Sequence, residues 1–366
     1  MNNRGFCGSY RPDDVRFLLK RLSQQPFIDV ANKEFLIQSG ARHYSEMLSP
    51  ESLPSPRYLQ VFKDALAANR QQMAGDCLRL AALIAARRSG PITLVSLVRA
   101  GTPVGVILKH LLQCVLGREV AHYSVSIIRD RGIDAVALQH ILQQGHRPES
   151  IVFIDGWTGK GVISRVLEQA VNAFNLQHRV AIDTGLYVLS DLAGTAACAA
   201  SAEDYLIPSS ILNATVSGLV SRSVLNDSIG PDDFHGCVYY DEFESQDQSQ
   251  LFSDGLVADA TRLAAQQGVP TALPIDRVKM ARVSTDFLQA TQERYSVEDL
   301  NLIKPGIGEA TRVLLRRVPR LLILRDPAVA DVAHLKLLAI EKNVPLIVDA
   351  GLPYQAVSLI GSVLDG

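Results

Sequence analysis

Two short segments follow apolar runs and carry residues that could bind phosphate groups. The stronger one, FIDGWTGKG (153–161), ends an apolar run at Asp155 and continues with Gly156, Trp157, Thr158, Gly159, Lys160 and Gly161. Glycine lets backbone N–H groups approach an anion closely, and the N-terminus of a following helix adds a favourable dipole. Because Thr158 can donate from its hydroxyl and Lys160 can supply a positive charge, this segment predicts a phosphate-binding loop.

The second segment, LVRAGTPVG (97–105), places a cation after another apolar run. Its residues of interest are Arg99, Ala100, Gly101, Thr102 and Pro103. Arg99 could face a leaving phosphate group, and Asp155 could hold ribose hydroxyls or a Mg²⁺ ion that carries phosphate oxygens. Two phosphate sites with a carboxylate between them suit a phosphorylated sugar diphosphate. A plain tight turn is the alternative for each loop.

A repeating alternation of strands and helices must position these loops. Apolar, β-branched runs predict strands at 92–98, 120–128, 151–155 and 184–190, with helices between them at 106–116, 134–144 and 162–174. This alternation predicts a parallel α/β sheet, in which ligands bind at the carboxyl ends of the strands. Helices are expected before the sheet, near 12–22 and over 57–88.

The C-terminal part has a second, smaller alternation. An acidic, polar stretch at 241–256 predicts a linker, with a helix at 251–267. Beyond residue 295 the pattern predicts helices at 308–317, 332–343 and 354–360 and strands at 320–326 and 344–351. We therefore expect a sheet domain over 1–242 with its core at about 90–225, a linker with a helix over 243–294, and a small α/β domain over 295–366.

Composition limits the classes of function. The chain has 366 residues, 36 Lys and Arg against 38 Asp and Glu, and a net charge of −2, so it has no global basic field for nucleic acid. Its five cysteines are scattered without CxxC spacing, which argues against a disulfide framework and a zinc site. No apolar run is long enough for a membrane span or a signal peptide, so the sequence predicts a cytoplasmic protein without a membrane partner.

A charged segment lies near the proposed site. Arg129, Asp130 and Arg131 fall at the end of the predicted strand 120–128, beside the two loops. This segment is too rich in charge to be only a strand end. One interpretation is a solvated turn with surface ion pairs.

Several long motifs carry a resemblance to a known family. GSYRPDDVRFLLK, SGARHYSEMLSPE, SLVRAGTPVG, HYSVSIIRDRGID, FIDGWTGKG and DYLIPSSILNATVSGLVSR together resemble the phosphoribosyltransferase of bacterial tellurite-resistance stress operons, a family also labelled cysteine protease StiP. The resemblance covers about residues 5–242. It implies a type I phosphoribosyltransferase-like parallel sheet with an N-terminal helical extension, a Mg²⁺ cofactor, and phosphoribosyl diphosphate (PRPP) or a ribonucleotide as ligand. It also implies that Arg129, Asp130 and Arg131 belong to a mobile hood that closes over the ligand and shields the reacting atoms from water. Gly156 stands where the type I pattern has a second acid.

The C-terminal part resembles the Pelota-type RNA-binding domain. The segments IKPGIGEATRVLLRRVPRLLIL (303–324) and DVAHLKLLAIEKNVPLIV (331–348) carry this likeness, which implies a smaller α-β-α domain and structured RNA as a partner. Relatives have a Gly-x-Asn-Glu turn at a helix start, and here Gly308 replaces the amide residue. The RNA-facing residues implied are Lys304, Gly306, Gly308, Glu309, Arg312 and Arg316. The alternative is a domain that serves only in dimerisation.

The function expected from these features is a phosphoribosyltransferase-like enzyme in a stress response. Arg99 and Asp155 would be its catalytic residues, transferring or releasing a nucleobase at ribose C1, and the chain would form a homo-oligomer. One alternative is a cysteine protease with Cys7 as nucleophile and His43 as base. The other is a non-catalytic sensor whose ligand regulates RNA binding.

Overall fold

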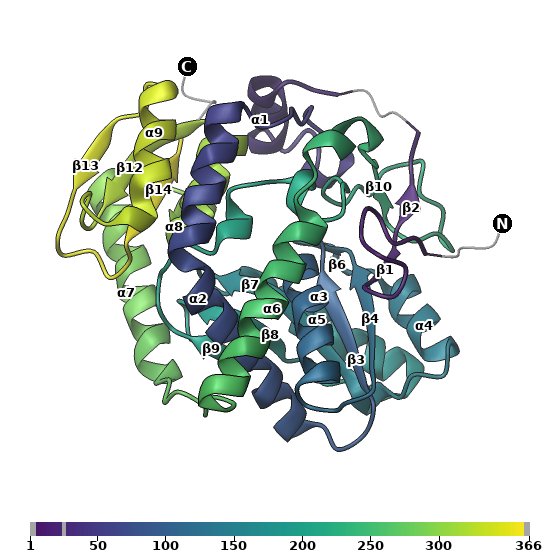
Figure 1. Ribbon diagram of the computed structural model, residues 1–366. Helices are drawn as coiled ribbons and strands as arrows, with labels where there is room; N and C mark the ends of the chain where they lie inside the picture. Colours follow the sequence, from purple (N-terminus) through teal and green to yellow (C-terminus); the bar gives the residue numbers. More distant parts are fainter. Residues whose placement is uncertain (1–4, 24–26, 362–366) are drawn as a thin grey trace.

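The computed structural model describes residues 5–23 and 27–361, which form two packed α/β units (Figure 1). The N-terminal unit, up to residue 267, contains a parallel six-stranded sheet with the order β1-β4-β3-β7-β8-β9. The strands of this sheet are β1 (Arg16–Leu18), β3 (Ile92–Leu97), β4 (Val120–Val125), β7 (Ile151–Thr158), β8 (Leu186–Asp191) and β9 (Cys198–Ser201). Two short ladders flank it, formed by β2 (Lys20–Arg21) with β10 (Gly236–Cys237) and by β5 (Ile127–Ile128) with β6 (Gly132–Ile133).

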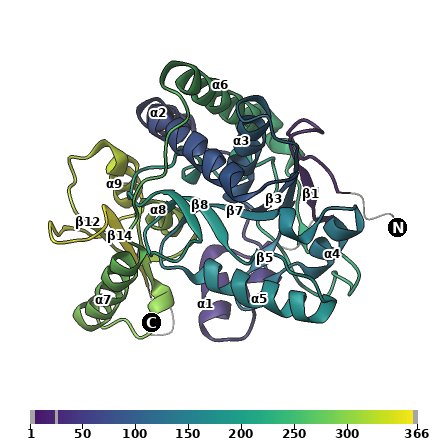
Figure 2. The same cartoon turned by 90° about the horizontal axis from the view of Figure 1, so that it is seen from below.

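Helices cover both faces of the parallel sheet (Figure 2). One face carries α2 (Pro56–Arg87), α3 (Gly101–Cys114) and α6 (Ser249–Gln267), and the other carries α4 (Ala135–Gln143) and α5 (Val162–His178). The short helix α1 (Val30–Gln38) lies above the carboxyl edge of the strands. Strands buried on both faces need continuous apolar sequence, and all six residues of β3 are buried. The predicted doubly covered parallel sheet is therefore confirmed.

The first twenty residues differ from the prediction. The sequence predicts a helix over 12–22, but β1 and β2 lie there, and β1 pairs with β4 in parallel. Phe17 and Leu18 are both fully buried at the sheet edge. Burial of these two side chains against the sheet outweighs the local helix signals, which are weak priors.

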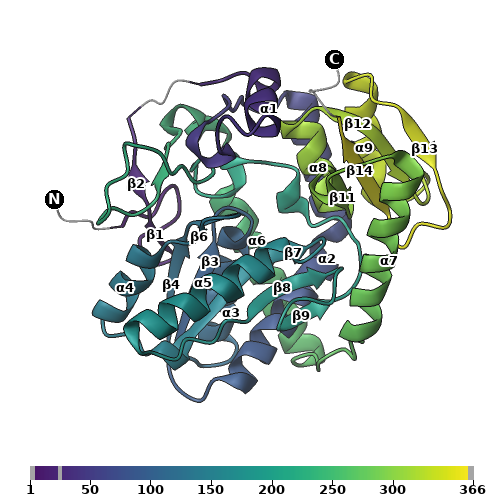
Figure 3. The same ribbon diagram turned by 180° about the vertical axis from the view of Figure 1, so that it is seen from behind.

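The C-terminal unit, from residue 277, has a four-stranded mixed sheet with the order β11-β14-β12-β13 (Figure 3). Its strands are β11 (Ile303–Pro305), β12 (Pro319–Leu324), β13 (Leu346–Val348) and β14 (Ala356–Ile360). Its helices are α7 (Arg277–Tyr295), α8 (Ile307–Arg316) and α9 (Ala333–Glu341). The helix predicted over 354–360 is wrong, because β14 fills the centre of this sheet and its five residues are all buried.

The segment predicted as a linker, 243–294, forms two helices that each pack on one unit. Phe252 and Leu256 of α6 join the core of the N-terminal unit, whereas Phe287 and Leu288 of α7 cover the sheet of the C-terminal unit. The acidic stretch at its start is a short 3-10 helix, Asp241–Gln246, anchored by the buried Phe243.

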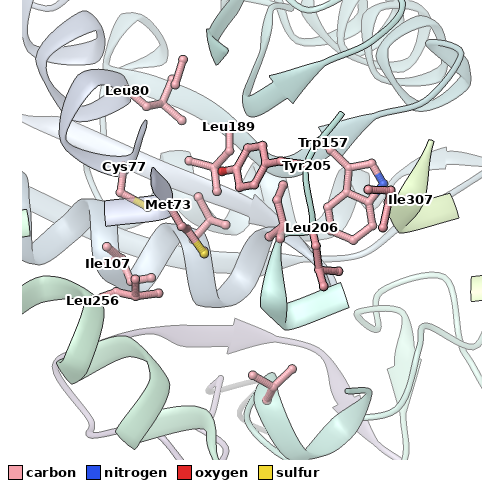
Figure 4. Close-up of a cluster of buried hydrophobic side chains, with 14 of the residues drawn as sticks. Met73, Cys77, Leu80, Ile107, Trp157, Leu189, Tyr205, Leu206, Leu256 and Ile307 are labelled. Carbon is pink, nitrogen blue, oxygen red and sulfur yellow. The ribbon is translucent and has the colours of Figure 1, made fainter. Parts of the chain in front are cut away.

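One apolar cluster runs through both units (Figure 4). It joins Trp157 at the end of β7 to Ile307, Ala310 and Leu314 of α8. Because these side chains are buried together, the two units share a core rather than a thin contact. Within the described residues, no helix has the length and apolar character required to cross a bilayer.

The close approach of α3 to β7 depends on a glycine. A Cβ added at Gly101 would lie 2.4 Å from the carbonyl oxygen of Ile154, whereas one added at Gly75 of α2 would meet nothing within 4 Å. Gly101→Ala should therefore lower the free energy of unfolding by about 1–3 kcal/mol, since the backbone of β7 must move. Gly75→Ala, its matched control, should raise it by about 0.5–1 kcal/mol through helix propensity. Denaturant unfolding checks both values, and equal effects would contradict the packing described here.

Candidate functional site

A cavity of about 580 Å³ lies between the carboxyl edge of the parallel sheet and the C-terminal unit. A smaller cavity of about 230 Å³ adjoins it, because ten lining residues, among them Arg99, Asp155 and Arg222, are common to both. The larger cavity is rich in cations. The positively charged residues in its lining are Lys33, Arg99, Arg129, Lys160, Arg222, Lys304, Arg312, Arg316 and Arg317, and the carboxylates are Glu34, Glu51, Asp155, Glu309 and Glu341.

The predicted phosphate loop is partly a strand and is held by internal contacts. β7 continues through Thr158, whose hydroxyl donates to Asp191 at 2.5 Å. The Lys160 ammonium donates to the carbonyl oxygens of Leu300 and Ile303 in the C-terminal unit. Burial, with the nearby Lys304, lowers the pKa of Lys160 to about 7. Four loop residues, Thr158 to Gly161, line the larger cavity, and phosphate binding by this loop stays a prediction.

The remaining loop glycines are also covered. A Cβ on Gly159 would come within 3.0 Å of Glu309 and Pro305, so the C-terminal unit lies directly against it. Gly161 has a left-handed φ of 73° as the N-cap of α5, and Thr195 fills the space beside it. A Cβ on Gly156 would lie 3.5 Å from the carbonyl oxygen of Ala100 in the other predicted loop. The two loops are thus neighbours, as the sequence predicts.

Asp155 is the carboxylate at the centre of the site. Burial raises its pKa to about 6, although Arg312 and the N–H of Gly156 both oppose the shift. It is the one predicted metal ligand, and the described residues include no group of three or more His, Cys, Asp or Glu placed to hold a metal ion. A single carboxylate with the Arg312 guanidinium beside it fits a bare Mg²⁺ ion poorly. Mg²⁺ stays a prediction.

The loop at 97–105 supplies a buried cation. Arg99 is 9% exposed, and its Nη1 donates to Oε1 of Glu51 at 2.6 Å and to the carbonyl of Val220. Ala100 and Pro103 line the smaller cavity beside it. Thr102 is turned inward, with its hydroxyl 2.7 Å from that of Ser124.

The predicted hood is the turn of the β5–β6 hairpin, and only part of it reaches the cavity. Arg129 lies over the ring of Tyr44 and lines the larger cavity. Asp130 is mostly exposed, and Arg131 pairs with Glu46 at 2.5 Å outside the lining. The alternative of surface ion pairs therefore describes Asp130 and Arg131, while Arg129 belongs to the site.

The predicted RNA-facing turn lies in the interface between the units. Gly306 precedes α8 with a φ of 90°, and a Cβ on Gly308 would lie 2.5 Å from the ring of Trp157. The side chain that RNA-binding relatives carry at this turn has no room here. Arg312, four residues further along α8, lies 4.4 Å from the Trp157 ring centroid and pairs with Glu309 at 2.6 Å.

Asp204 fastens this turn to the N-terminal unit. Its Oδ1 accepts from the N–H of Ile307 at 2.9 Å and its Oδ2 from the N–H of Gln355 at 2.8 Å. A carboxylate at a helix N-terminus satisfies a free N–H group and favours the helix dipole. Burial nevertheless raises the pKa of Asp204 to about 6.

The predicted thiol and imidazole have separate contacts. Cys7 is half-buried and its thiol faces the carbonyl of Gly8. His43 caps a 3-10 turn through Ser45, and its Nε2 lies 3.9 Å from Asp130. No described contact joins Cys7 to His43.

Two cavity residues from irregular segments, Arg222 and Asn213, are not among the predicted site residues. Arg222 donates to the carbonyls of Tyr44 and Met47, and Asn213 accepts from Arg316. Arg222 lies in one of the quoted motifs, but nothing in the local pattern shows that it faces the loops.

The fold and site define a parallel α/β protein with a second α/β unit docked on the carboxyl edge of its sheet. The model of the family described as "Tellurite-like stress resistance cysteine protease StiP" matches residues 8–257, and that of the "PELOTA RNA binding domain" matches residues 282–362. The chain therefore belongs to the StiP family and carries a Pelota-type domain.

A curated relative extends this similarity over the whole chain. The protein named "Cysteine protease StiP" from Acinetobacter baylyi is 41% identical over 98% of this chain and 94% of its own length. This match and the family description contradict the predicted phosphoribosyltransferase activity. Both name a cysteine protease, which is one of the alternatives that the sequence leaves open.

Solved structures show distant likenesses. The hypoxanthine phosphoribosyltransferase of Trypanosoma cruzi is 9% identical, covers 37% of this chain and 82% of its own, and has a TM-score of 0.28. A hypoxanthine-guanine phosphoribosyltransferase of Bacillus anthracis is 10% identical over 37% of this chain and 80% of its own, with a TM-score of 0.27. Likeness at this level carries no argument about activity.

The raised pKa of Asp155 predicts a pH-dependent stability. Between its ordinary pKa of 3.8 and about 6, the folded chain holds a proton that the unfolded chain releases, so the contribution of Asp155 to the free energy of unfolding falls as the pH rises. Asp155→Asn should be more stable than the wild type by roughly 1–3 kcal/mol at pH 7.5 and equal to it below pH 4.

Thermal denaturation across this pH range measures the difference. Asp227→Asn removes the same charge at an exposed position and should change little at any pH. A variant at position 155 that is less stable than the wild type at pH 7.5 would show that the Asp155 carboxylate is stabilised by its surroundings.

Proposed function

We propose that this protein is a cysteine protease. The main support is the 41% identity with a protein named as a cysteine protease, over nearly the full length of both chains. A cysteine protease needs a thiolate, an imidazole that takes the thiol proton, and a group that orients the imidazole. The described residues limit where these three parts could meet.

Three of the five thiols are unsuited to nucleophilic attack. Cys77, Cys198 and Cys237 are buried, and burial raises the pKa of each thiol, to about 12 for Cys237. Buried thiols of this kind are inert, because the thiolate is the reactive form. Cys114 is exposed and Cys7 is half-buried, so these two are the candidate nucleophiles.

Cys114 has the better-placed partners. It follows His110 by four residues on α3, and residues at this spacing share one helix face. The Nε2 atom of His110 lies 2.8 Å from Oδ1 of the buried Asp14. Burial alone would raise the pKa of Asp14, but the hydrogen bond and charge of His110 bring it below its usual value.

This geometry supports a Cys114–His110–Asp14 arrangement. Asp14 would orient the ring through Nε2, which leaves Nδ1 of His110 to take the thiol proton. The thiol of Cys114 donates to the carbonyl of His110, so it must rotate toward the ring before it attacks a peptide carbonyl. Cys7 remains the competing nucleophile, although no described imidazole contacts it.

Cys114→Ser and Cys7→Ser test this assignment. Hydrolysis of fluorescently labelled casein by the full chain should fall at least 100-fold in Cys114→Ser, because a hydroxyl is a much weaker nucleophile than a thiolate. Cys7→Ser should keep wild-type activity, and His110→Ala should lose as much as Cys114→Ser. Loss in Cys7→Ser alone would move the nucleophile to Cys7, and no hydrolysis by the wild type would overturn the proposed protease.

We also propose RNA as a partner of the C-terminal unit, on the strength of its family match. The predicted RNA-facing turn is fastened by Asp204, so RNA could reach it only if the units separate there. Asp204→Ala leaves the N–H groups of Ile307 and Gln355 without their acceptor and should weaken the docking.

Asp204→Ala should therefore raise the affinity of the full chain for a structured RNA at least several-fold. Filter binding at several salt concentrations should show a steeper salt dependence in the variant, as more phosphates are contacted. Asp326→Ala is the matched control, because it removes an exposed carboxylate of the C-terminal unit outside the interface. Equal affinities in both variants would contradict RNA binding through this turn.

A further inference from the structure

Three arginines from separate parts of the chain meet at the smaller cavity. Arg99 follows β3, Arg222 comes from an irregular segment of the N-terminal unit, and Arg316 ends α8 of the C-terminal unit. We call these three residues the arginine cluster. Two units of the protein therefore contribute guanidinium groups to one small space.

The charges of the arginine cluster are poorly compensated. Burial, followed by the proximity of Arg99, lowers the pKa of Arg316 to about 9, and the same two causes lower that of Arg222 to about 10. Glu51 pairs with Arg99. Among the charged residues that line the smaller cavity, Asp155 is the carboxylate, and Arg312 adds a fourth guanidinium group. Like charges buried together are costly unless an anion joins them.

Several donors at the cavity also lack an acceptor. Nη2 of Arg99 and Nε of Arg316 are buried and have no hydrogen-bond partner among the described residues, and the same holds for the hydroxyls of Ser209, Ser210 and Ser223. Arg316 makes its described hydrogen bond with the amide oxygen of Asn213 and none with a carboxylate. Buried donors are normally satisfied, so these atoms indicate a missing acceptor.

From the cluster and its free donors we infer that the smaller cavity binds a small oxyanion with at least two negative charges. Arg99 and Arg222 hold it from the N-terminal unit, and Arg316 holds it from the C-terminal unit. Guanidinium groups suit such a ligand because each can donate two parallel hydrogen bonds to its oxygens. Bound in this place, the anion ties the two units together. The inference does not depend on proteolysis.

The test is calorimetric titration of the full chain with inorganic phosphate and, separately, with succinate, against sodium chloride at matched ionic strength. Phosphate binding alone assigns the site to a phosphoryl group, and binding of both assigns it to dianions in general. Arg316→Gln should weaken the binding at least ten-fold. Arg320→Gln, the same substitution at an exposed position of β12, should leave it unchanged.

A second readout keeps the test decisive if Arg316→Gln alters the fold. Without added anion, Arg316→Gln should melt at or above the wild-type temperature, because it removes a repelled cation. Phosphate should raise the melting temperature of the wild type and of Arg320→Gln only. No binding of either anion, or an equal thermal shift in Arg316→Gln, would overturn the proposal.

Discussion

The contact between the start of α8 and the carboxyl edge of the parallel sheet governs the rest of this structure. Gly308 lies flat against Trp157, and Asp204 binds the free N–H of Ile307. An added Cβ at Gly308 would overlap the indole ring, so the contact tolerates only glycine. The apolar side of the same helix continues into the core of the N-terminal unit.

This docking decides what the candidate site can do. Lys160 is bound by carbonyls of the C-terminal unit, and Gly159 lies beneath Glu309. The turn expected to face RNA is the surface that covers the sheet edge. The docked unit also contributes Arg312 and Arg316 to the lining of the two cavities. The site between the units is therefore built by both units. The proposed protease residues lie apart from these cavities, on α3 and the segment before β1.

The sequence predicted the parts of the fold whose signals are local. The alternation of apolar runs located β3, β7, α3 and α5, and the spacing in 57–88 located α2. The sequence-based prediction is wrong where contacts between distant residues decide the structure. The strand β1 forms because Phe17 and Leu18 are buried against β4, and β14 forms because it pairs within the second sheet. The sequence correctly predicts that the two loops are neighbours at the sheet edge. It does not show that Lys160 is covered by residues 140 and 143 positions further along the chain. The sequence shows that Gly308 replaces the amide residue of the Pelota-type relatives. It does not show that the ring of Trp157 occupies the space of a side chain at this position.

The intrinsic fluorescence of the protein reports whether the C-terminal unit docks over the sheet edge. The chain has a single tryptophan, Trp157, which is 9% exposed beneath Gly308 and Arg312. In the native full chain its emission should be blue-shifted and only weakly quenched by acrylamide, and both properties should be lost in denaturant. Native emission at the wavelength of water-exposed tryptophan, quenched as readily as in the unfolded chain, would contradict the docking.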